Sequence, residues 1–207
     1  VLTYHTKFDI DIRRALPTKL MQDQAIKMLI SNISCADEVW TVSEGARQNL
    51  IDLGYEENEH HRIRIMENGV DFPRGRADPE LRAELGVEGH GPVFIFVGRL
   101  LWYKGIRHIL DSLKILDEKN IDFRMMFVGD GADRAEIEAC VDELKLREKV
   151  IFTGAIYDRE ELRVYYTAGD LFIFPSLYDT NGIVVREAAA CGVASVLIKG
   201  SCAAEGI

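Results

Sequence analysis

The chain has 207 residues, of which 47% are apolar and 29% are charged, and its formal charge is −9. This length suits one large domain or two smaller ones. A net acidic chain is a poor candidate for general nucleic-acid binding, which needs a basic face against the phosphates. No apolar run approaches the roughly 20 residues that span a bilayer, and the first residues do not read as a signal peptide.

The four cysteines show no metal-binding or redox spacing. They lie far apart, at Cys35, Cys140, Cys191 and Cys202. We therefore predict reduced, mostly buried thiols in a cytosolic protein, with Cys202 exposed near the end. The chain begins within one predicted strand and ends soon after another, so we expect a fragment that is truncated at both ends.

The first part of the chain alternates short apolar runs with helical patterns. A strand over 1–6 precedes apolar residues at helical spacing between 12 and 34, which Pro17 is expected to interrupt. Ser43 is expected to cap a helix that Gly54 ends. A further strand is predicted over 38–43, and the stretch 62–71 is predicted to be a strand that leads into a turn at Asn68 and Gly69.

Residues 72–91 are rich in proline, glycine and charge. They contain one short predicted helix over 78–86, with Asp78 as cap and Pro79 at its first position. We place a linker at 75–91, which separates a domain over 1–74 from a domain over 92–207.

The second domain has a regular rhythm. Nearly continuous apolar strands alternate with helices, which is typical of a parallel sheet that is covered on both faces. The predicted strands cover 93–97, 123–129, 150–154, 171–176 and 194–198, and the helices cover 105–119, 133–146, 158–168 and 182–191.

The loops that follow these strands are candidates for a binding site, because ligands bind at the carboxyl ends of parallel strands. The first loop carries Arg99 and Lys104, and the helix after it offers free amides to an anion. Such a pair suits a phosphate group, although both side chains could instead pair with surface carboxylates. Gly98, Gly129 and Asp130 lie in the same set of loops.

The glycines alone are a weak signal, because turns need them as well. The stretch "GDGAD" is neither a P-loop nor a full dinucleotide fingerprint. This argues against a P-loop nucleotidase and against an ordinary dinucleotide dehydrogenase.

The stretch "PSLYDTNGIVVREAAACG" over 175–192 is the most specific. Asp179 lies in its loop, Gly182 lets a ligand approach the amides of Ile183 and Val184, and Glu187 follows within the helix. A solvated helix position is the plain alternative for Glu187. Its apolar and small neighbours indicate instead that the carboxylate needs a partner, and sugar hydroxyls would serve.

Together these stretches resemble the retaining glycosyltransferases of the GT-B fold, family 4 or "group 1". The resemblance is carried, in order, by "TYHT", "ADEVWTVSEGARQNL", "MENGVD", "VGRLLWYKG", "FVGDGADR", "VIFTGAI", "AGDLFIFPS" and "DTNGIVVREAAACG". It implies an α/β fold with a Rossmann-like donor-binding domain, preceded by part of a second Rossmann-like domain on the acceptor side.

The resemblance also implies roles. Arg99 and Lys104 would hold the donor's pyrophosphate, Glu187 the ribose hydroxyls, and Gly182 with Ile183 and Val184 the phosphate or sugar. Ile156 would lie near the base, and His5 near the sugar's reactive carbon, although a lone histidine at a strand end is often a core residue. Asp179 stands where the family usually has glutamate, and Asn181 where it usually has an aromatic residue.

The implied reaction moves a hexose from a UDP- or GDP-linked donor to a sugar or lipid-linked acceptor, with retention and without a cofactor or metal. A phosphorylase or epimerase of the same fold, or a nucleotide-binding fragment without activity, are the alternatives. A metal site remains open at Asp9 and Asp11, which form a D-x-D. The expected location is the cytoplasm, at the inner membrane face where the acceptor is lipid-linked.

Overall fold

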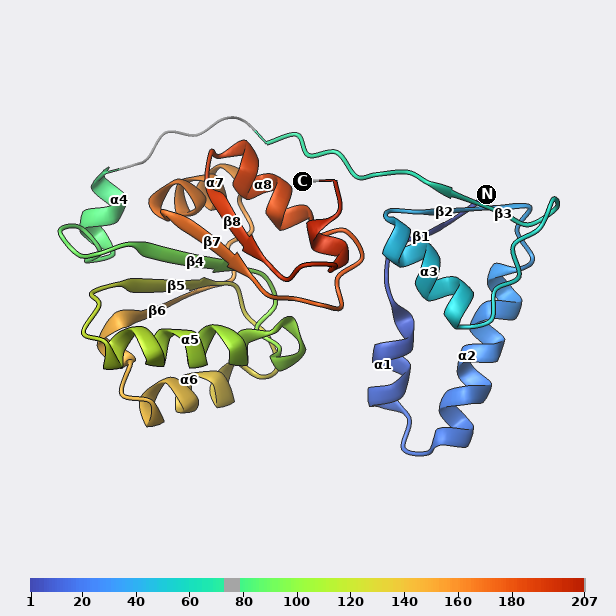
Figure 1. Ribbon diagram of the computed structural model, residues 1–207, viewed down its shortest axis with the longest axis horizontal. Coiled ribbons are helices and arrows are strands. Elements are labelled where there is room, and N and C mark those ends of the chain that lie inside the picture. The colour runs from blue at the N-terminus through green and yellow to red at the C-terminus, as the bar shows by residue number, and fades with distance from the viewer. Residues whose placement is uncertain (73–78, 207) are drawn as a thin grey trace. The chain divides into compact units, whose positions relative to one another are not determined.

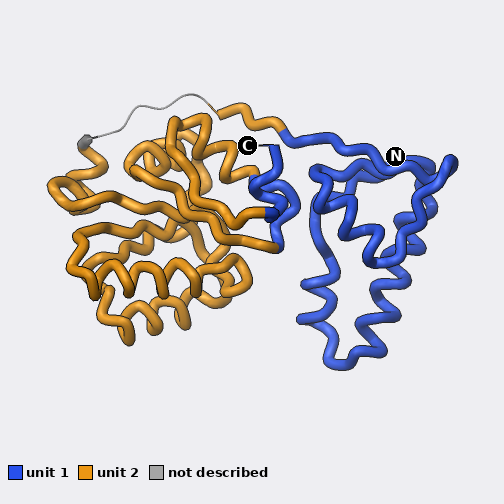
Figure 2. Tube along the Cα trace, viewed as in Figure 1, with its two compact units in different colours: residues 1–68, 178–182, 200–207 blue, residues 69–177, 183–199 orange. Residues whose placement is uncertain are grey.

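The computed structural model describes residues 1–72 and 79–206 and divides them into two compact units (Figure 2). Unit 1 comprises residues 1–68, 178–182 and the segment from 200, and unit 2 comprises 69–177 and 183–199. Parts of the predicted linker, and the predicted cap Asp78, lie outside the described residues. None of the described helices is both long and apolar enough to cross a bilayer.

Unit 1 is built on a parallel sheet of three strands in the order β1-β2-β3. The strands cover Leu2–Tyr4, Glu38–Thr41 and Arg62–Ile65, and the helices α1, α2 and α3 cover Phe8–Ala15, Lys19–Ile33 and Glu44–Asp52. The break between α1 and α2 falls at Pro17, and the Ser43 hydroxyl accepts a hydrogen bond from the Ala46 amide, both as predicted.

The core of unit 1 forms where these helices pack on the sheet. Its buried members are Tyr4, Ile26, Ile30, Ile33, Val39, Leu50, Tyr55 and Ile63. β3 ends at Ile65, before the turn predicted at Asn68 and Gly69. The amide of Met66 still bonds to the Thr41 carbonyl at 2.7 Å, and beyond it the chain leaves the sheet.

Two segments from late in the sequence complete unit 1. They are the loop 178–182 and the stretch from Gly200, which contains the short 3-10 helix η3 (Cys202–Ala204). Both oxygens of the Glu205 carboxylate accept amide hydrogens at the start of α3, from Glu44 at 2.8 Å and Gly45 at 2.9 Å. The Cys202 thiol is buried here, so the prediction that it is exposed was wrong.

Unit 2 is a doubly wound parallel sheet in the order β6-β5-β4-β7-β8. Helices α5 and α6 lie on one face of the sheet and α7 and α8 on the other (Figure 1), as right-handed crossovers require. The strands are Val93–Val97, Arg124–Val128, Val150–Gly154, Leu171–Phe174 and Ala194–Leu197 for β4 to β8. The helices are Pro79–Glu84, Ile106–Glu118, Arg134–Glu143, Arg159–Ala168 and Ile183–Ala190 for α4 to α8, with 3-10 helices η1 (Trp102–Lys104) and η2 (Arg147–Lys149).

A row of aromatic rings crosses the sheet of unit 2 near the carboxyl ends of its strands. Phe127 of β5 pairs in register with Phe96 and Phe152 and stacks on Phe152 with ring centroids 5.3 Å apart. Phe174 of β7 stacks on Phe96 at 5.8 Å. Such pairs add about 0.5–1.5 kcal/mol each beyond their buried area, so the strand ends that carry the loops are firmly held.

The predicted parallel sheet with helices on both faces is confirmed. One predicted helix was too long. We expected it over 133–146, but α6 ends at Glu143, because Leu144 caps it and Lys145 takes a positive φ of 61°.

Candidate nucleotide-sugar site

The loops after β4, β5 and β6 are joined by backbone hydrogen bonds beyond the strand ends. The Gly98 amide bonds to the Val128 carbonyl at 3.0 Å, and the Gly129 amide bonds to the Gly154 carbonyl at 2.8 Å. Gly129 has φ 138°, and a Cβ there would lie 2.0 Å from the Gly98 carbonyl oxygen. Glycine is therefore required at 129 for the loops to approach each other this closely.

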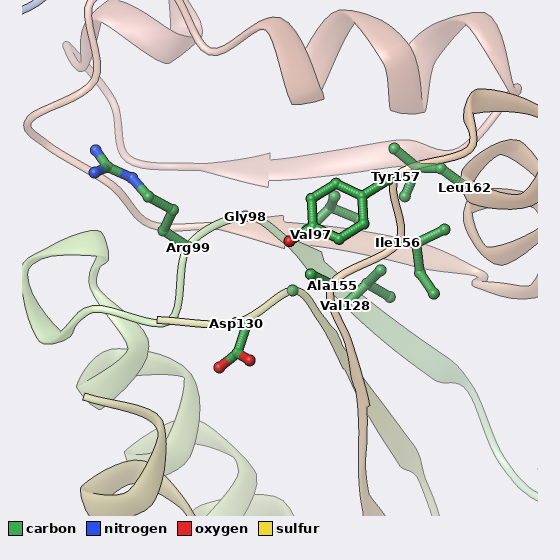
Figure 3. A pocket seen from close by; sticks show the side chains of 10 residues that line it. Val97, Gly98, Arg99, Val128, Asp130, Ala155, Ile156, Tyr157 and Leu162 are labelled. Carbon is green, nitrogen blue, oxygen red and sulfur yellow. The ribbon is translucent and has the colours of Figure 1, made fainter. Parts of the chain in front are cut away.

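These loops enclose a pocket of about 300 Å³ at the carboxyl edge of the sheet (Figure 3). Five predicted site residues line it: Gly98, Arg99, Gly129, Asp130 and Ile156. The charged ends of Arg99 and Asp130 point away from Ile156 and Tyr157, so the middle of the pocket is apolar. The other lining residues are Val97, Val128, Ala155, Tyr157 and Leu162. The flat face of an aromatic ring, such as that of a nucleobase, suits this surface.

Tyr103 brings the two predicted cations together. Nη2 of Arg99 donates a hydrogen bond to the Tyr103 hydroxyl at 3.0 Å, and Nζ of Lys104 lies 5.5 Å from the centre of the Tyr103 ring. The same ammonium is 5.9 Å from the ring of Phe174. Sequence reasoning missed Tyr103, although an aromatic residue between two cations in a short loop was a signal for such an arrangement.

The loop that carries the cations is anchored from the neighbouring loop. The Asp133 carboxylate accepts the Trp102 amide at 2.8 Å, and the Trp102 indole donates to Glu136 at 3.0 Å. Gly105, with φ 80°, is the N-cap of α5, and glycine is needed there because a Cβ would lie 2.3 Å from the Pro175 carbonyl oxygen. The amides at the start of α5 therefore follow directly after Lys104, where they favour an anion.

The Asp130 carboxylate contacts groups that are close to it in the sequence. Its Oδ1 accepts the Gly131 amide at 2.8 Å, and its Oδ2 lies 3.7 Å from Nη1 of Arg134. A carboxylate that is held in this way stabilises its own turn. Its predicted contact with a substrate stays a prediction.

Glu187 lies in α8 and is only 8% exposed, so the alternative of a solvated helix position was wrong. Its Oε2 accepts a hydrogen bond from the Tyr166 hydroxyl at 2.9 Å, and its Oε1 lies 3.8 Å from Nη2 of Arg159. Burial, followed by the nearby Glu187 charge, raises the pKa of Tyr166 far above its ordinary value, so the phenol stays a donor. Sequence reasoning predicted that Glu187 needs a partner but not that Tyr166 provides it.

The remaining predicted residues divide between the units. Ile183 and Val184 open α8 in unit 2, whereas His5, Asp179 and Gly182 belong to unit 1. His5 is exposed, which excludes the core alternative for it, and its carbonyl accepts the Thr180 hydroxyl at 2.7 Å. Gly182 has φ 65°, as a glycine before a helix allows.

Asn181, which stands where the family usually has an aromatic residue, makes a polar contact of its own. It is 4% exposed, and its side-chain amide donates to the Val42 carbonyl at 2.7 Å. A phenylalanine could not make this bond. The amide therefore ties the loop 178–182 to the end of β2 within unit 1.

The D-x-D of Asp9 and Asp11 lies in helix α1 and not in a loop. Residues two apart on a helix do not face each other. Asp9 instead lies 4.0 Å from Arg13, one helical turn later.

Comparison with known proteins decides the family. The sequence profile of "Glycosyl transferases group 1" matches residues 77–207. The chain belongs to this family. Among curated relatives, the 2-deoxystreptamine glucosyltransferase of Streptomyces kanamyceticus is 34% identical over 166 residues, which cover 76% of this chain and 39% of that protein.

Solved GT-B glycosyltransferases share the fold. Sucrose-phosphate synthase from Thermosynechococcus elongatus aligns with a TM-score of 0.75 and 26% identity, over 95% of this chain and 49% of that one. Anabaena HepE, solved with UDP and glucose, aligns with a TM-score of 0.74 and 23% identity, over 87% of this chain and 50% of that one. This group 1 chain thus spans about half the length of these relatives or less.

Proposed function

We propose that the protein is a glycosyltransferase that moves a hexose from a UDP- or GDP-linked donor to a sugar or lipid-linked acceptor. The observation that carries this proposal is the arrangement of Arg99 and Lys104 around Tyr103, beside an apolar pocket, in a chain of the group 1 family. The glucosyltransferase from Streptomyces supports the transfer of a hexose, and the complex of HepE with UDP and glucose supports a UDP-linked donor.

The proposed chemistry follows from where charge develops. Glycosyl transfer passes through an oxocarbenium-like transition state, with positive charge on the ring and negative charge on the departing phosphate oxygen. Fixed cations and helix amides that face this oxygen stabilise it most in a site that excludes water. Arg99, Lys104 and the start of α5 would do so without a metal ion, and the base would occupy the pocket at Ile156.

The finer features of the reaction are proposed from the family resemblance. They are retention of configuration, the binding of the ribose by Glu187, and the contacts of Gly182, Ile183 and Val184 with the phosphate or sugar. The contact of Asp179 with the transferred sugar and the place of His5 near the reactive carbon belong with them. A lipid-linked acceptor would bring the protein to the cytoplasmic membrane face.

A binding experiment tests the donor site. Isothermal titration with UDP and with GDP, repeated in excess EDTA, should show binding that the chelator leaves unchanged. Arg99→Ala, Lys104→Ala and Glu187→Ala should each weaken that binding by about 10-fold, because each removes a charge-assisted contact.

Arg147→Ala is the matched control. Its side chain is 56% exposed. Arg147 belongs to η2, which precedes β6 and so lies at the amino ends of the strands, whereas the pocket lies at their carboxyl ends. This variant should bind the nucleotide as the unaltered chain does. Near-native affinity in all three site variants would contradict the assignment, and consumption of inorganic phosphate in place of a nucleotide sugar would contradict the reaction.

A further inference from the structure

The carboxylate of Glu187 has two oxygens with different surroundings. Oε2 accepts a hydrogen bond from the Tyr166 hydroxyl at 2.9 Å, in the interior of unit 2. Oε1 faces only the guanidinium of Arg159, at 3.8 Å, which is beyond hydrogen-bond distance. Among the residues that the structure describes, Oε1 accepts no hydrogen bond, so its lone pairs remain available.

Tyr166 is itself held in one position. It is fully buried, and its ring packs against Phe72, edge to face, and against Phe172, each with centroids 5.8 Å apart. Because the Tyr166 ring is fixed, its hydroxyl donates to Oε2 of Glu187 from one direction. A carboxylate without that bond could rotate about its last torsion, which is broad and roughly two-fold.

Arg159 is held from the other side. Its guanidinium lies 5.6 Å from the centre of the Phe72 ring, and its side chain is 62% exposed. It begins α7, two residues after Tyr157 of the pocket wall. Phe72 therefore packs against both the residue that bonds Oε2 and the residue that faces Oε1.

We propose that Tyr166 is a positioning residue for nucleotide binding: it fixes Oε2 of Glu187 so that Oε1 accepts hydrogen bonds from the ribose hydroxyls of the donor. This inference rests on the proposed function and deepens it. Tyr166 acts through Glu187 and does not touch the ligand. Its contribution should therefore depend on a ribose hydroxyl and on the presence of the carboxylate.

The test compares two ligands that differ in one hydroxyl. Isothermal titration of the chain with UDP and with 2′-deoxy-UDP should show a preference for UDP of about 10-fold, the size expected for a hydrogen bond to a charged group. Tyr166→Phe, which keeps the packed ring, should reduce that preference to about 2-fold, with the affinity for 2′-deoxy-UDP nearly unchanged. GDP and 2′-deoxy-GDP serve as the second pair.

A double-mutant cycle shows whether Tyr166 acts through Glu187. Glu187→Gln alone should also reduce the preference, and adding Tyr166→Phe to it should change the preference no further. Tyr165→Phe, the neighbouring tyrosine of α7, is the control and should leave the preference intact. Since Glu187→Gln leaves Tyr166 in place, it also tests the ribose contact if Tyr166→Phe fails to fold.

The outcomes separate this inference from the proposed function. An unchanged preference in Tyr166→Phe, an equal loss for both ligands, or an additive effect in the cycle would overturn the role of Tyr166 alone. No preference in the unaltered chain would overturn the contact of Glu187 with the ribose. Binding of neither UDP nor GDP by the unaltered chain would overturn the proposed function, and the inference with it.

Discussion

Tyr103 is the residue that links the two cations of the loop after β4. Its hydroxyl accepts from Arg99 at 3.0 Å, and its ring lies 5.5 Å from the Lys104 ammonium. Tyr103→Phe removes the acceptor but keeps the ring, so we expect UDP binding to weaken by about 5-fold, as for the loss of one ordinary hydrogen bond. Tyr103→Ala removes both contacts and should weaken binding further. Titration calorimetry measures both effects.

Tyr55→Phe is the control for this pair. Tyr55 is buried in unit 1, and the structure shows no hydrogen-bond partner for its hydroxyl among the described residues. Removing that hydroxyl should leave UDP binding unchanged. If Tyr103→Phe and Tyr103→Ala also bind UDP as the unaltered chain does, Arg99 and Lys104 reach their ligand without help from Tyr103.

At the scale of elements, the close approach of the loops after β4, β5 and β6 depends on Gly129. Gly129→Ala adds a Cβ 2.0 Å from the Gly98 carbonyl oxygen at φ 138°, so we expect the unfolding free energy to fall by more than ~2 kcal/mol. Gly192→Ala, at φ 77° with no atom within 4 Å of the added Cβ, should cost only about 1 kcal/mol. Urea unfolding of both variants measures the difference. Equal losses of unfolding free energy in the two variants would mean that the positive φ accounts for the loss and that the close contact with Gly98 does not add to it.

The elements themselves could be predicted from the sequence because their periodicity is local. The helix predicted over 105–119 is α5, in which Ile109, Leu110 and Leu113 recur at helical spacing and are buried. The strand order β6-β5-β4-β7-β8 could not be predicted in this way, because alternation gives parallel strands but not the point at which the chain crosses back.

The candidate site was predictable to the same extent. Spacing placed Arg99 at the end of a strand and Glu187 in a following helix, whereas the place of Ile156 was implied by the family resemblance. Five predicted residues line one pocket. The partners Tyr166 and Tyr103 were not predicted. The bond from Tyr166 to Glu187 joins side chains 21 residues apart on different helices. Periodicity predicts which face of each helix is buried, but it does not predict which polar atoms of two helices come into contact.

At the scale of the whole molecule, net charge and local charge make opposite predictions about an anionic ligand. The chain carries −9 overall, which repels a nucleoside diphosphate, whereas Arg99 and Lys104 attract it. Screening acts on both, with a Debye length of about 10 Å at 0.1 M salt. Because charges close to the ligand dominate at such distances, we expect UDP affinity to fall between about 50 and 300 mM NaCl, a range that includes the physiological ionic strength of about 150 mM. Titration at each salt concentration measures it, and the double variant Arg99→Ala/Lys104→Ala should lose or reverse this dependence. A rise in affinity with salt for the unaltered chain would show that the acidic surface, and not the β4 loop, controls the approach of the nucleotide.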